Sequence, residues 1–349
     1  MRTTLSILLL SCLTFIAPTA MAAPDIETEQ LLSQWDLDEH HDLRGVIVML
    51  HGQVLAERYY NGETPDTLHD IRSAGKSITS LLMGIAIDRG LIAGTSAPVR
   101  AYWREAEPTE AGKVKIADLL TMRSGLDAYD ADPTSPGQED KLDDAVDPQA
   151  FLLSLPQANV PGAIYRYNSA ASSIAGIVIA KAAGTTMAEF AGEQLFGPMG
   201  IKRWTWASDA GGFTKGQGNL SLTLRDFAAI GEMVRQGGTS HGRKIVSENW
   251  LRKSLAAIVP IADSDPYADG YGYYWYSKTQ KLGDRAVRVS FASGNGGNKL
   301  YIVPDLDLVV AITSSAYGKG YGQKRSELIL LTLLREIAQH ISYSSKFEQ

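Results

Sequence analysis

Ser73 and Lys76 lie three residues apart in the segment Asp70-Ile71-Arg72-Ser73-Ala74-Gly75-Lys76-Ser77. Two side chains at this spacing share one face of a helix, so we expect them to meet. The partial positive charge at a helix N-terminus favours a serine alkoxide. A lysine that faces an apolar interior loses hydration, which lowers its pKa and lets it take the serine proton. The two residues therefore predict a nucleophile and its base.

The same spacing also has a purely structural interpretation. Roughly one Ser-x-x-Lys is expected by chance in a chain with this many serines and lysines. Ser73 would then cap the helix, and Lys76 would be a solvated residue of its first turn. A lysine in the first turn opposes the helix dipole, which argues against this interpretation. The spacing alone leaves both interpretations open.

Two other segments have residue types suited to a site. Tyr167 follows a turn at Pro161-Gly162 and precedes a predicted helix, so its phenol can face a cleft or pack in the core. The segment Ser293-Gly294-Asn295-Gly296-Gly297-Asn298 has three glycines in four positions between two predicted strands. Such glycines indicate the close approach of a ligand or another backbone. A plain Asn-Gly hairpin turn explains the central pair but not the flanking glycines, Gly294 and Gly297.

The elements that would position these residues have strands at both ends of the chain and helices in the middle. A hairpin over 45–60 precedes a buried helix over 73–89, in which apolar residues recur at helical spacing. The remaining predicted helices cover 25–35, 114–121, 170–183, 187–195, 222–236, 247–255 and 324–341, and the remaining strands cover 272–277, 286–292, 299–303 and 306–313.

This order predicts an α/β fold. The N-terminal hairpin and the C-terminal strands would form one antiparallel sheet flanked by helices, with a mostly helical lobe inserted between them. We expect the α/β lobe to comprise about residues 23–85 and 265–349, and the helical lobe about residues 86–264.

Residues 1–22 have the pattern of a secretory signal peptide. Arg2 precedes an apolar stretch from Leu5 to Ile16, and Ala20-Met21-Ala22 supplies the small residues for cleavage. We therefore predict that residues 23–349 are periplasmic or secreted and are not stably inserted in a membrane. The alternatives are lipoprotein processing at Cys12 and an uncleaved anchor.

Composition argues against several classes of function. The net charge of −6 disfavours nucleic-acid binding and docking on an anionic membrane. Cys12 is the only cysteine, so disulfides, thiolate catalysis and cysteine-ligated zinc are not expected after cleavage. The histidines lack a metal-ligand spacing. The acidic residues within 127–148 lack the regular pattern of a calcium loop, so we interpret them as a solvated loop. No metal and no cofactor is expected.

Five ordered motifs carry a resemblance to a known family. They are Ser73-Ala74-Gly75-Lys76, Ile116–Leu126, Pro161-Gly162 leading to Tyr167, Asn219–Ala228, and Gly294–Gly297 followed by Pro304-Asp305. With these motifs the chain resembles the serine β-lactamase and penicillin-binding-protein superfamily, in its class C-like branch of esterases, carboxypeptidases and nylon-oligomer hydrolases. The matches keep their order and spacing from about residue 43 to 340. The resemblance implies a β-lactamase-like α/β fold.

The resemblance also implies roles for individual residues. Ser73 would be acylated, and Lys76 and Tyr167 would share the proton transfers, with the choice of acylation base left open. The backbone N–H groups of Ser73 and Gly297 would form an oxyanion hole. Residues after the tyrosine and within the glycine segment would contact the substrate, namely Asn168, Ser169, Gly294, Asn295 and Gly296.

The second motif departs from the family pattern of Tyr-x-Asn. Tyr167 is followed by Asn168 and then by Ser169. The amide that orients a substrate carbonyl is therefore shifted by one residue or replaced by a hydroxyl.

The third motif also departs, because it usually begins with lysine or histidine and Gly294 stands in that place. The usual cation holds a substrate carboxylate. Lys299 lies five residues further on and is expected to be too far along its strand to substitute. Arg72 and Arg123 remain as cations that could reach the cleft from other elements.

The leading hypothesis is a serine hydrolase that cleaves an ester or amide of a small-molecule or peptide substrate through an acyl-enzyme. Without the usual cation, neutral substrates are expected to be preferred over carboxylates. One alternative is a β-lactamase or D-alanyl-D-alanine carboxypeptidase. Another, from a different class, is a non-hydrolytic module that binds peptidoglycan or a partner. The sequence does not indicate the natural substrate or the oligomeric state.

Overall fold

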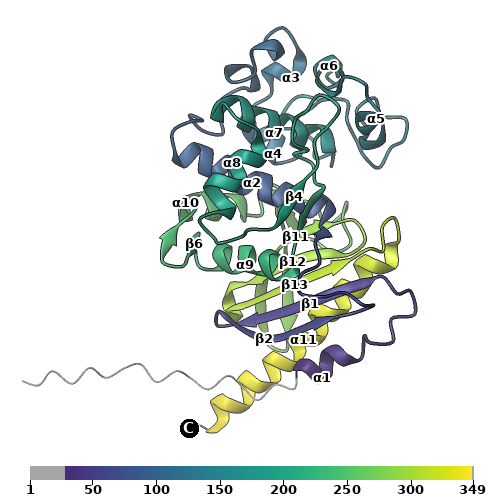
Figure 1. Cartoon of the computed structure of the whole chain (residues 1–349), viewed down its shortest axis with the longest axis vertical. Coiled ribbons are helices and arrows are strands. Elements are labelled where there is room, and N and C mark those ends of the chain that lie inside the picture. The colour runs from purple at the N-terminus through teal and green to yellow at the C-terminus, as the bar shows by residue number, and fades with distance from the viewer. Residues whose placement is uncertain (1–27, 348–349) are drawn as a thin grey trace, which may run out of the picture.

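The computed structural model describes residues 28–347, and Figure 1 shows a sheet-based lobe joined to a mostly helical lobe. The predicted signal peptide, with Cys12, lies outside the described residues. Helix α1 runs Thr28–Ser33, within the range expected for a first helix. It lies in the sheet-based lobe together with the C-terminal helix α11, Gly320–Phe347 (Figure 1).

An eight-stranded antiparallel sheet has the order β2-β1-β13-β12-β11-β10-β9-β8. Its N-terminal hairpin joins the C-terminal strands because β1 pairs with β13, with Val46 opposite Ile312. The predicted sheet, built from both ends of the chain, is confirmed. Its strands are β1 Leu43–Leu50, β2 Gln53–Tyr59, β8 Val259–Pro260, β9 Gly270–Tyr271, β10 Tyr276–Leu282, β11 Arg285–Gly294, β12 Asn298–Val303 and β13 Leu308–Ser314.

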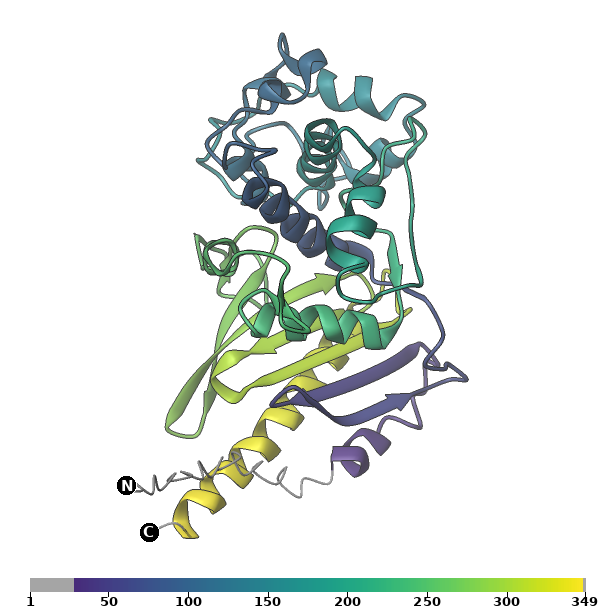
Figure 2. The same ribbon diagram turned by 60° about the vertical axis from the view of Figure 1, so that its left-hand side comes forward.

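Helices cover both faces of this sheet, which explains why the central strands β12 and β13 are buried along their whole length. Figure 2 shows α11 on one face and α9, Leu224–Arg235, on the other. A Cβ on Gly231 of α9 would lie 2.7 Å from the side chain of Leu300, so the glycine permits this close packing. Helix α9 falls within the range 86–264 expected for the helical lobe, yet it packs on β12 and β13. These strands cover the apolar face of the helix.

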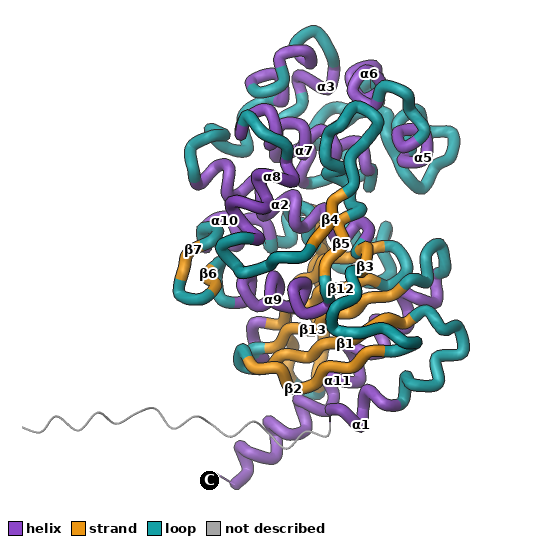
Figure 3. Tube along the Cα trace, viewed as in Figure 1, coloured by secondary structure: helices purple, strands orange, loops and turns teal. Residues whose placement is uncertain are grey.

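Two buried helices, α2 (Gly75–Asp88) and α7 (Ser169–Ala183), pack together at the centre of the helical lobe. Shorter helices surround them: α3 Glu110–Lys113, α4 Ile116–Leu120, α5 Glu139–Asp143, α6 Pro148–Ser154, α8 Met187–Ala191 and α10 Glu248–Ser254. The short strands at the junction with the large sheet (Figure 3) are β3 His69–Asp70, β4 Trp204–Trp206 and β5 Leu220–Leu222. A separate two-stranded ribbon consists of β6 Thr239–Ser240 and β7 Arg243–Lys244.

No single helix within residues 28–347 is long and apolar enough to span a membrane. The bent pair of Ser169–Ala183 and Met187–Phe196, which meet at 75°, reaches that length and composition only when taken together. The first member of the pair is the buried core helix α7.

Of the strand predicted over 272–277, only residues 276–277 lie in a strand, β10, and residues 272–275 form a bend between β9 and β10. A Cβ on Gly272 would lie 2.0 Å from the carbonyl oxygen of Ser254, so the chain passes directly against the end of α10. Tyr274 then adopts a φ of +60°. An apolar pattern alone does not reveal such a bend, because it is imposed by the neighbouring helix.

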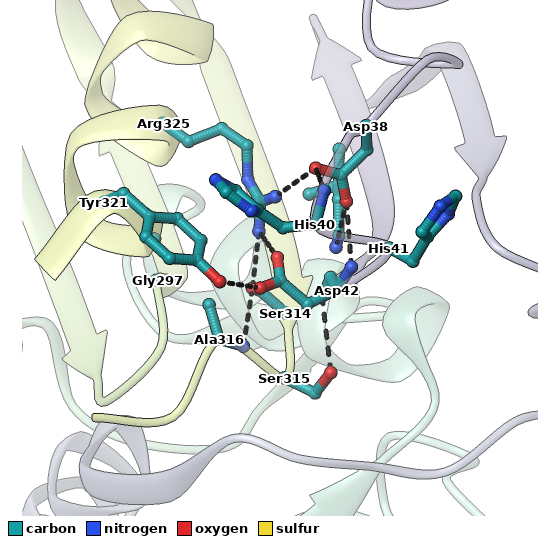
Figure 4. A network of polar contacts seen from close by, with 12 residues as sticks. Asp38, His40, His41, Asp42, Gly297, Ser314, Ser315, Ala316, Tyr321 and Arg325 are labelled. Carbon is teal, nitrogen blue, oxygen red and sulfur yellow. Dashed lines mark hydrogen bonds and ion pairs between the residues drawn. The ribbon is translucent and has the colours of Figure 1, made fainter. Parts of the chain in front are cut away.

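A buried ion-pair network ties the segment before β1 to α11 (Figure 4). The guanidinium of Arg325 contacts Asp38 at 2.9 Å and Asp42 at 2.6 Å, and it donates to the hydroxyl of Ser314 at 2.8 Å. The Tyr321 hydroxyl donates to the other oxygen of Asp42 at 2.5 Å. Burial by itself raises the pKa of Asp38, but backbone N–H groups and the charge of Arg325 outweigh burial and lower it.

We expect Arg325→Leu to lower the free energy of unfolding by about 3–5 kcal/mol, because it leaves two buried carboxylates without their cation. Urea unfolding followed by circular dichroism measures the loss. Lys324→Leu, an exposed change on the same helix, serves as the matched control and should stay within about 0.5 kcal/mol of wild type. Because the folded pKa of Asp38 is lowered, its stabilisation is present above the unfolded pKa and is lost as the pH falls through the folded pKa. A loss no larger than that of the control would contradict a stabilising network.

Candidate active site

Ser73 and Lys76 meet as their spacing predicts. The Lys76 Nζ atom lies 3.1 Å from Ser73 Oγ, at the start of α2. A short 3₁₀ turn, Arg72–Ala74, precedes the helix, and Arg72 has the unusual φ of +53°. The Arg72 N–H donates to Asp70 Oδ1 at 2.8 Å, which holds this corner in place. The geometry therefore fits a nucleophile with its base, and it does not fit the alternative of a solvated lysine in the first turn.

Lys76 is only 1% exposed, and its ammonium has three hydrogen-bond acceptors. Besides Ser73, it donates to the backbone carbonyl of Gln217 at 2.8 Å and to Ser169 Oγ at 3.2 Å. Ser169 is the first residue of α7, so the packing of α2 on α7 brings the two side chains together. Sequence reasoning did not find Gln217, since a backbone carbonyl carries no residue-type signal.

Two carboxylates lie beyond Ser169, from the segment that was expected to be a solvated acidic loop. Ser169 Oγ is 2.9 Å from Asp130 Oδ2 and 2.9 Å from Glu139 Oε1. The expectation therefore fails for these two acids, although Asp140, Asp143, Asp144 and Asp147 are exposed. Backbone bonding fixes the loop here, because the Asp130 N–H donates to the Tyr167 carbonyl at 3.1 Å. The density of acids in 127–148 was the only sequence signal, and it does not distinguish these two from the others.

The acids reverse the expected shift of the lysine. Burial lowers the pKa of Lys76, but the charges of Tyr167, Glu139 and Asp130 outweigh burial, so the pKa is raised. The pKa of Asp130 is raised to about 6, mainly by burial, with a further increase from the charge of Glu139 that Lys76 partly offsets. Lys76 is therefore an ammonium in the unliganded site, which corrects the expectation of a lowered pKa.

Tyr167 lies beside the same lysine, with the Lys76 Nζ atom 5.0 Å from the centroid of its ring. It is half-buried and immediately precedes the cap of α7. Ser73, Lys76 and Tyr167 are thus brought together, although they come from two separate segments of the chain.

Asn168 does not fit the substrate-binding role expected for it. It is the N-cap of α7, where its Oδ1 accepts from the Ala171 N–H at 2.7 Å. Its amide nitrogen donates to the carbonyl of Arg166 at 2.7 Å, and the side chain is 1% exposed. Both ends of the amide are therefore engaged within the protein. Ser169 occupies the position next to Lys76 instead.

The glycine segment forms the turn between β11 and β12. A Cβ on Gly294 would lie 2.0 Å from the carbonyl oxygen of Ile71, so β11 passes directly against the turn before Ser73. Gly297 does not fit the oxyanion hole, because its N–H donates to the Gly294 carbonyl at 3.2 Å. A Cβ on Gly297 would meet the Gly322 carbonyl of α11 at 2.3 Å, on the side of the sheet away from α9.

The other two residues of this turn, Asn295 and Gly296, contact the segment 317–318. Asn295 uses its side-chain oxygen to accept from the Gly318 N–H at 2.8 Å. Within residues 28–347, no hydrogen bond engages the backbone N–H of Asn295. Gly296 packs against Tyr317, whose ring would lie 2.9 Å from a Cβ at that position.

Lys299 lies closer to the third motif than its sequence distance suggested. It stands opposite Ser293 in the pairing of β11 with β12, and its Nζ donates to Ser293 Oγ at 2.9 Å. It is 1% exposed, with the ring of Phe291 centred 4.8 Å from the Nζ atom. Burial lowers the pKa of Lys299 to about 8. The Lys299 ammonium therefore lies beside the third motif, where it is buried and bonded to the Ser293 hydroxyl.

The two arginines considered as substitutes have partners of their own. Arg72 stacks on the ring of Tyr317 at 4.0 Å and lies 3.5 Å from a carboxylate oxygen of Asp70. Arg123 donates from Nε to the Thr121 hydroxyl at 3.1 Å. Within the described part of the chain, no cluster of three or more His, Cys, Asp or Glu side chains is arranged to hold a metal ion.

Comparisons with known proteins identify the family of the chain. Residues 36–334 match the family described as Beta-lactamase. A 6-aminohexanoate-dimer hydrolase of Paenarthrobacter ureafaciens is 27% identical over 317 residues, covering 85% of this chain and 76% of that protein.

Solved structures show the same fold. A penicillin-binding-protein homologue from Caulobacter crescentus has a TM-score of 0.69 at 18% identity, covering 90% of this chain and 96% of its own. A family VIII carboxylesterase has a TM-score of 0.69 at 17% identity, covering 92% of this chain and 98% of its own. Because the family match spans most of the sequence, the chain belongs to the Beta-lactamase family and is a serine hydrolase.

Proposed function

We propose that this protein hydrolyses esters or amides through an acyl-enzyme formed on Ser73. The observation that carries the proposal is the contact of 3.1 Å between Ser73 Oγ and the buried Lys76 Nζ at the start of α2. Ser73 Oγ attacks the substrate carbonyl carbon while its proton passes to Lys76, and that proton then goes to the leaving group. Water later attacks the acyl carbon and releases Ser73. Tyr167, beside the same ammonium, assists these proton transfers.

The oxyanion hole is proposed to use the backbone N–H groups of Ser73 and Asn295 rather than Gly297. Gly294 adjoins Ile71, two residues before Ser73, and Asn295 is the next residue along the turn. The Asn295 N–H has no partner among the described residues, whereas the Gly297 N–H is engaged. A free donor beside the nucleophile is what a developing oxyanion requires.

The substrate is proposed to be a neutral small molecule or peptide with an ester or amide bond. The relatives include a 6-aminohexanoate-dimer hydrolase and a carboxylesterase by name, which supports hydrolysis of either bond. Gly294 supplies no cation, and Lys299 is buried with its ammonium bonded to the Ser293 hydroxyl. Asp130 and Glu139 add negative charge near Ser73, which disfavours a substrate carboxylate further.

Ser73→Ala is expected to abolish labelling by a fluorophosphonate and to reduce ester hydrolysis by several orders of magnitude, because the nucleophile is lost. Lys76→Ala should cause a loss of similar size, and Tyr167→Phe a smaller one with the fold intact. Mass analysis of the labelled peptide locates the adduct. Ser80→Ala is the matched control, since this buried hydroxyl lies one turn after Lys76 along α2 and has no hydrogen-bond partner in the described chain. Labelling that persisted in Ser73→Ala would contradict the assignment.

A neutral p-nitrophenyl acyl ester is expected to have a higher kcat/KM than a chromogenic cephalosporin. A charge-assisted hydrogen bond contributes about 1.5–3 kcal/mol. Without one, a carboxylate-bearing substrate should be disfavoured by roughly ten- to a hundredfold. A clear preference for the cephalosporin would instead support a β-lactamase or D-alanyl-D-alanine carboxypeptidase. Turnover of neither substrate, with no adduct on Ser73, would support a non-hydrolytic binding module.

Export to the periplasm or exterior is also proposed, on the pattern of Arg2, the apolar stretch and Ala20-Met21-Ala22. Signal peptidase should cut after Ala22, so N-terminal sequencing of protein recovered outside the cytoplasm should begin at Ala23. A lipid-modified Cys12 at the N-terminus would contradict this cleavage.

A further inference from the structure

We propose that Asp130 and Glu139 form a proton-accepting pair that acts through the Ser169 hydroxyl and converts Lys76 from an ammonium into the amine that activates Ser73. This inference rests on the proposed function, because it assigns the proton acceptor of the same site. It makes Asp130, Glu139 and Ser169 positioning residues that act on Ser73 only through Lys76.

The hydrogen bonds of Lys76 leave one route for its proton. An ammonium has three N–H donors, and the three acceptors are Ser73 Oγ, the Gln217 carbonyl and Ser169 Oγ. A backbone carbonyl does not take up a proton at neutral pH, and Ser73 must give a proton rather than receive one. Ser169 is the only acceptor of the three that leads on to carboxylates. The burial of Lys76 removes direct exchange with bulk water.

The Ser169 hydroxyl connects Lys76 to both acids. Its oxygen lies 3.2 Å from Lys76 Nζ, 2.9 Å from Asp130 Oδ2 and 2.9 Å from Glu139 Oε1. A hydroxyl has one proton to donate and two lone pairs to accept with. It accepts from Lys76 and donates to one of the two carboxylates, so it joins the ammonium to the acids in one hydrogen-bonded chain.

The relay moves protons without exchange with solvent. Lys76 Nζ gives a proton to Ser169 Oγ, and Ser169 gives its own hydroxyl proton to the ionised carboxylate. The result is a neutral amine, an intact hydroxyl and one newly protonated carboxyl group on Asp130. The amine then takes the Ser73 proton as Oγ bonds to the substrate carbonyl carbon. The reverse transfer restores the ammonium and the carboxylate after turnover.

The charges around Asp130 favour this acceptor. The charged groups that act on it are Lys76 on α2 and Glu139 on α5. The next charged pair is Asp143 with Lys215 at 2.8 Å, and Asp143 also accepts from the Gln217 side chain at 3.3 Å. Burial and the charge of Glu139 raise the pKa of Asp130 to about 6, so it binds a proton more readily than an ordinary carboxylate. The relay works only while Asp130 is ionised.

The test is the pH dependence of kcat/KM for a neutral ester in wild type and two isosteric variants. The wild-type rate should fall on the acid side near pH 6, because Asp130 that is already protonated cannot accept a proton. Asp130→Asn should lower the rate at neutral pH by roughly a hundredfold, since an amide does not accept the proton. Glu139→Gln should keep most of the neutral rate but move the acid limb to lower pH, because the charge that raises the Asp130 pKa is removed.

Asp140→Asn is the matched control, as an exposed carboxylate on the same helix as Glu139, and it should reproduce the wild-type profile. Circular dichroism and urea unfolding confirm that each variant is folded. Ser169→Ala is a second test of the relay, since it removes the connecting hydroxyl and keeps both acids. It should show the same loss of kcat/KM as Asp130→Asn.

The outcomes separate the two proposals. If wild type hydrolyses no ester or amide and is not labelled at Ser73, the proposed function fails. If wild type is active but Asp130→Asn is as fast or faster at neutral pH, the relay is wrong, because the acids then only hold Lys76 as an ammonium. A uniform loss in Glu139→Gln with an unmoved acid limb would also overturn the relay, in favour of a structural role.

Discussion

The burial of the Lys76 ammonium is the constraint on which the arrangement of this protein depends. A buried cation is costly unless each of its donors finds an acceptor. Lys76 finds one on its own helix turn, one on the backbone before β5 and one at the start of α7. Each acceptor belongs to a different segment, so a single charge specifies how the turn before α2, the Gln217 loop and α7 meet. The same contacts aim the amine at Ser73.

Close backbone contacts without side chains allow the two lobes to converge on this charge. Gly294 lets β11 pass against Ile71, and Gly75 lets the first turn of α2 approach the backbone of Gly218, with a hypothetical Cβ 3.1 Å from its Cα. Larger residues at these positions would separate the nucleophile from the sheet edge. The glycines that a strand tolerates poorly are therefore explained by the junction they form rather than by the turn alone.

Electrostatics distinguish this site from the family pattern in two places. At the third motif, Lys299 is buried and its ammonium donates to the Ser293 hydroxyl, so the charge is not exposed. Beyond the second motif, Ser169 links Lys76 to Asp130 and Glu139. The third motif thus lacks an exposed positive charge, and the second motif gains the negative charge of Asp130 and Glu139. Both changes act in the same direction on the charge of a substrate.

The sequence by itself determined what depends on short spacing. The Ser73–Lys76 contact, the buried helix that carries it and the antiparallel sheet from both chain ends follow from helical spacing and from the order of apolar elements. Only the tertiary structure decided the partners of Ser169, which lie 39 and 30 residues away, and the engagement of Asn168 and Gly297 within the fold. Helical spacing constrains neighbours within a turn, whereas long-range contacts depend on how whole helices and loops pack, which no local residue pattern encodes.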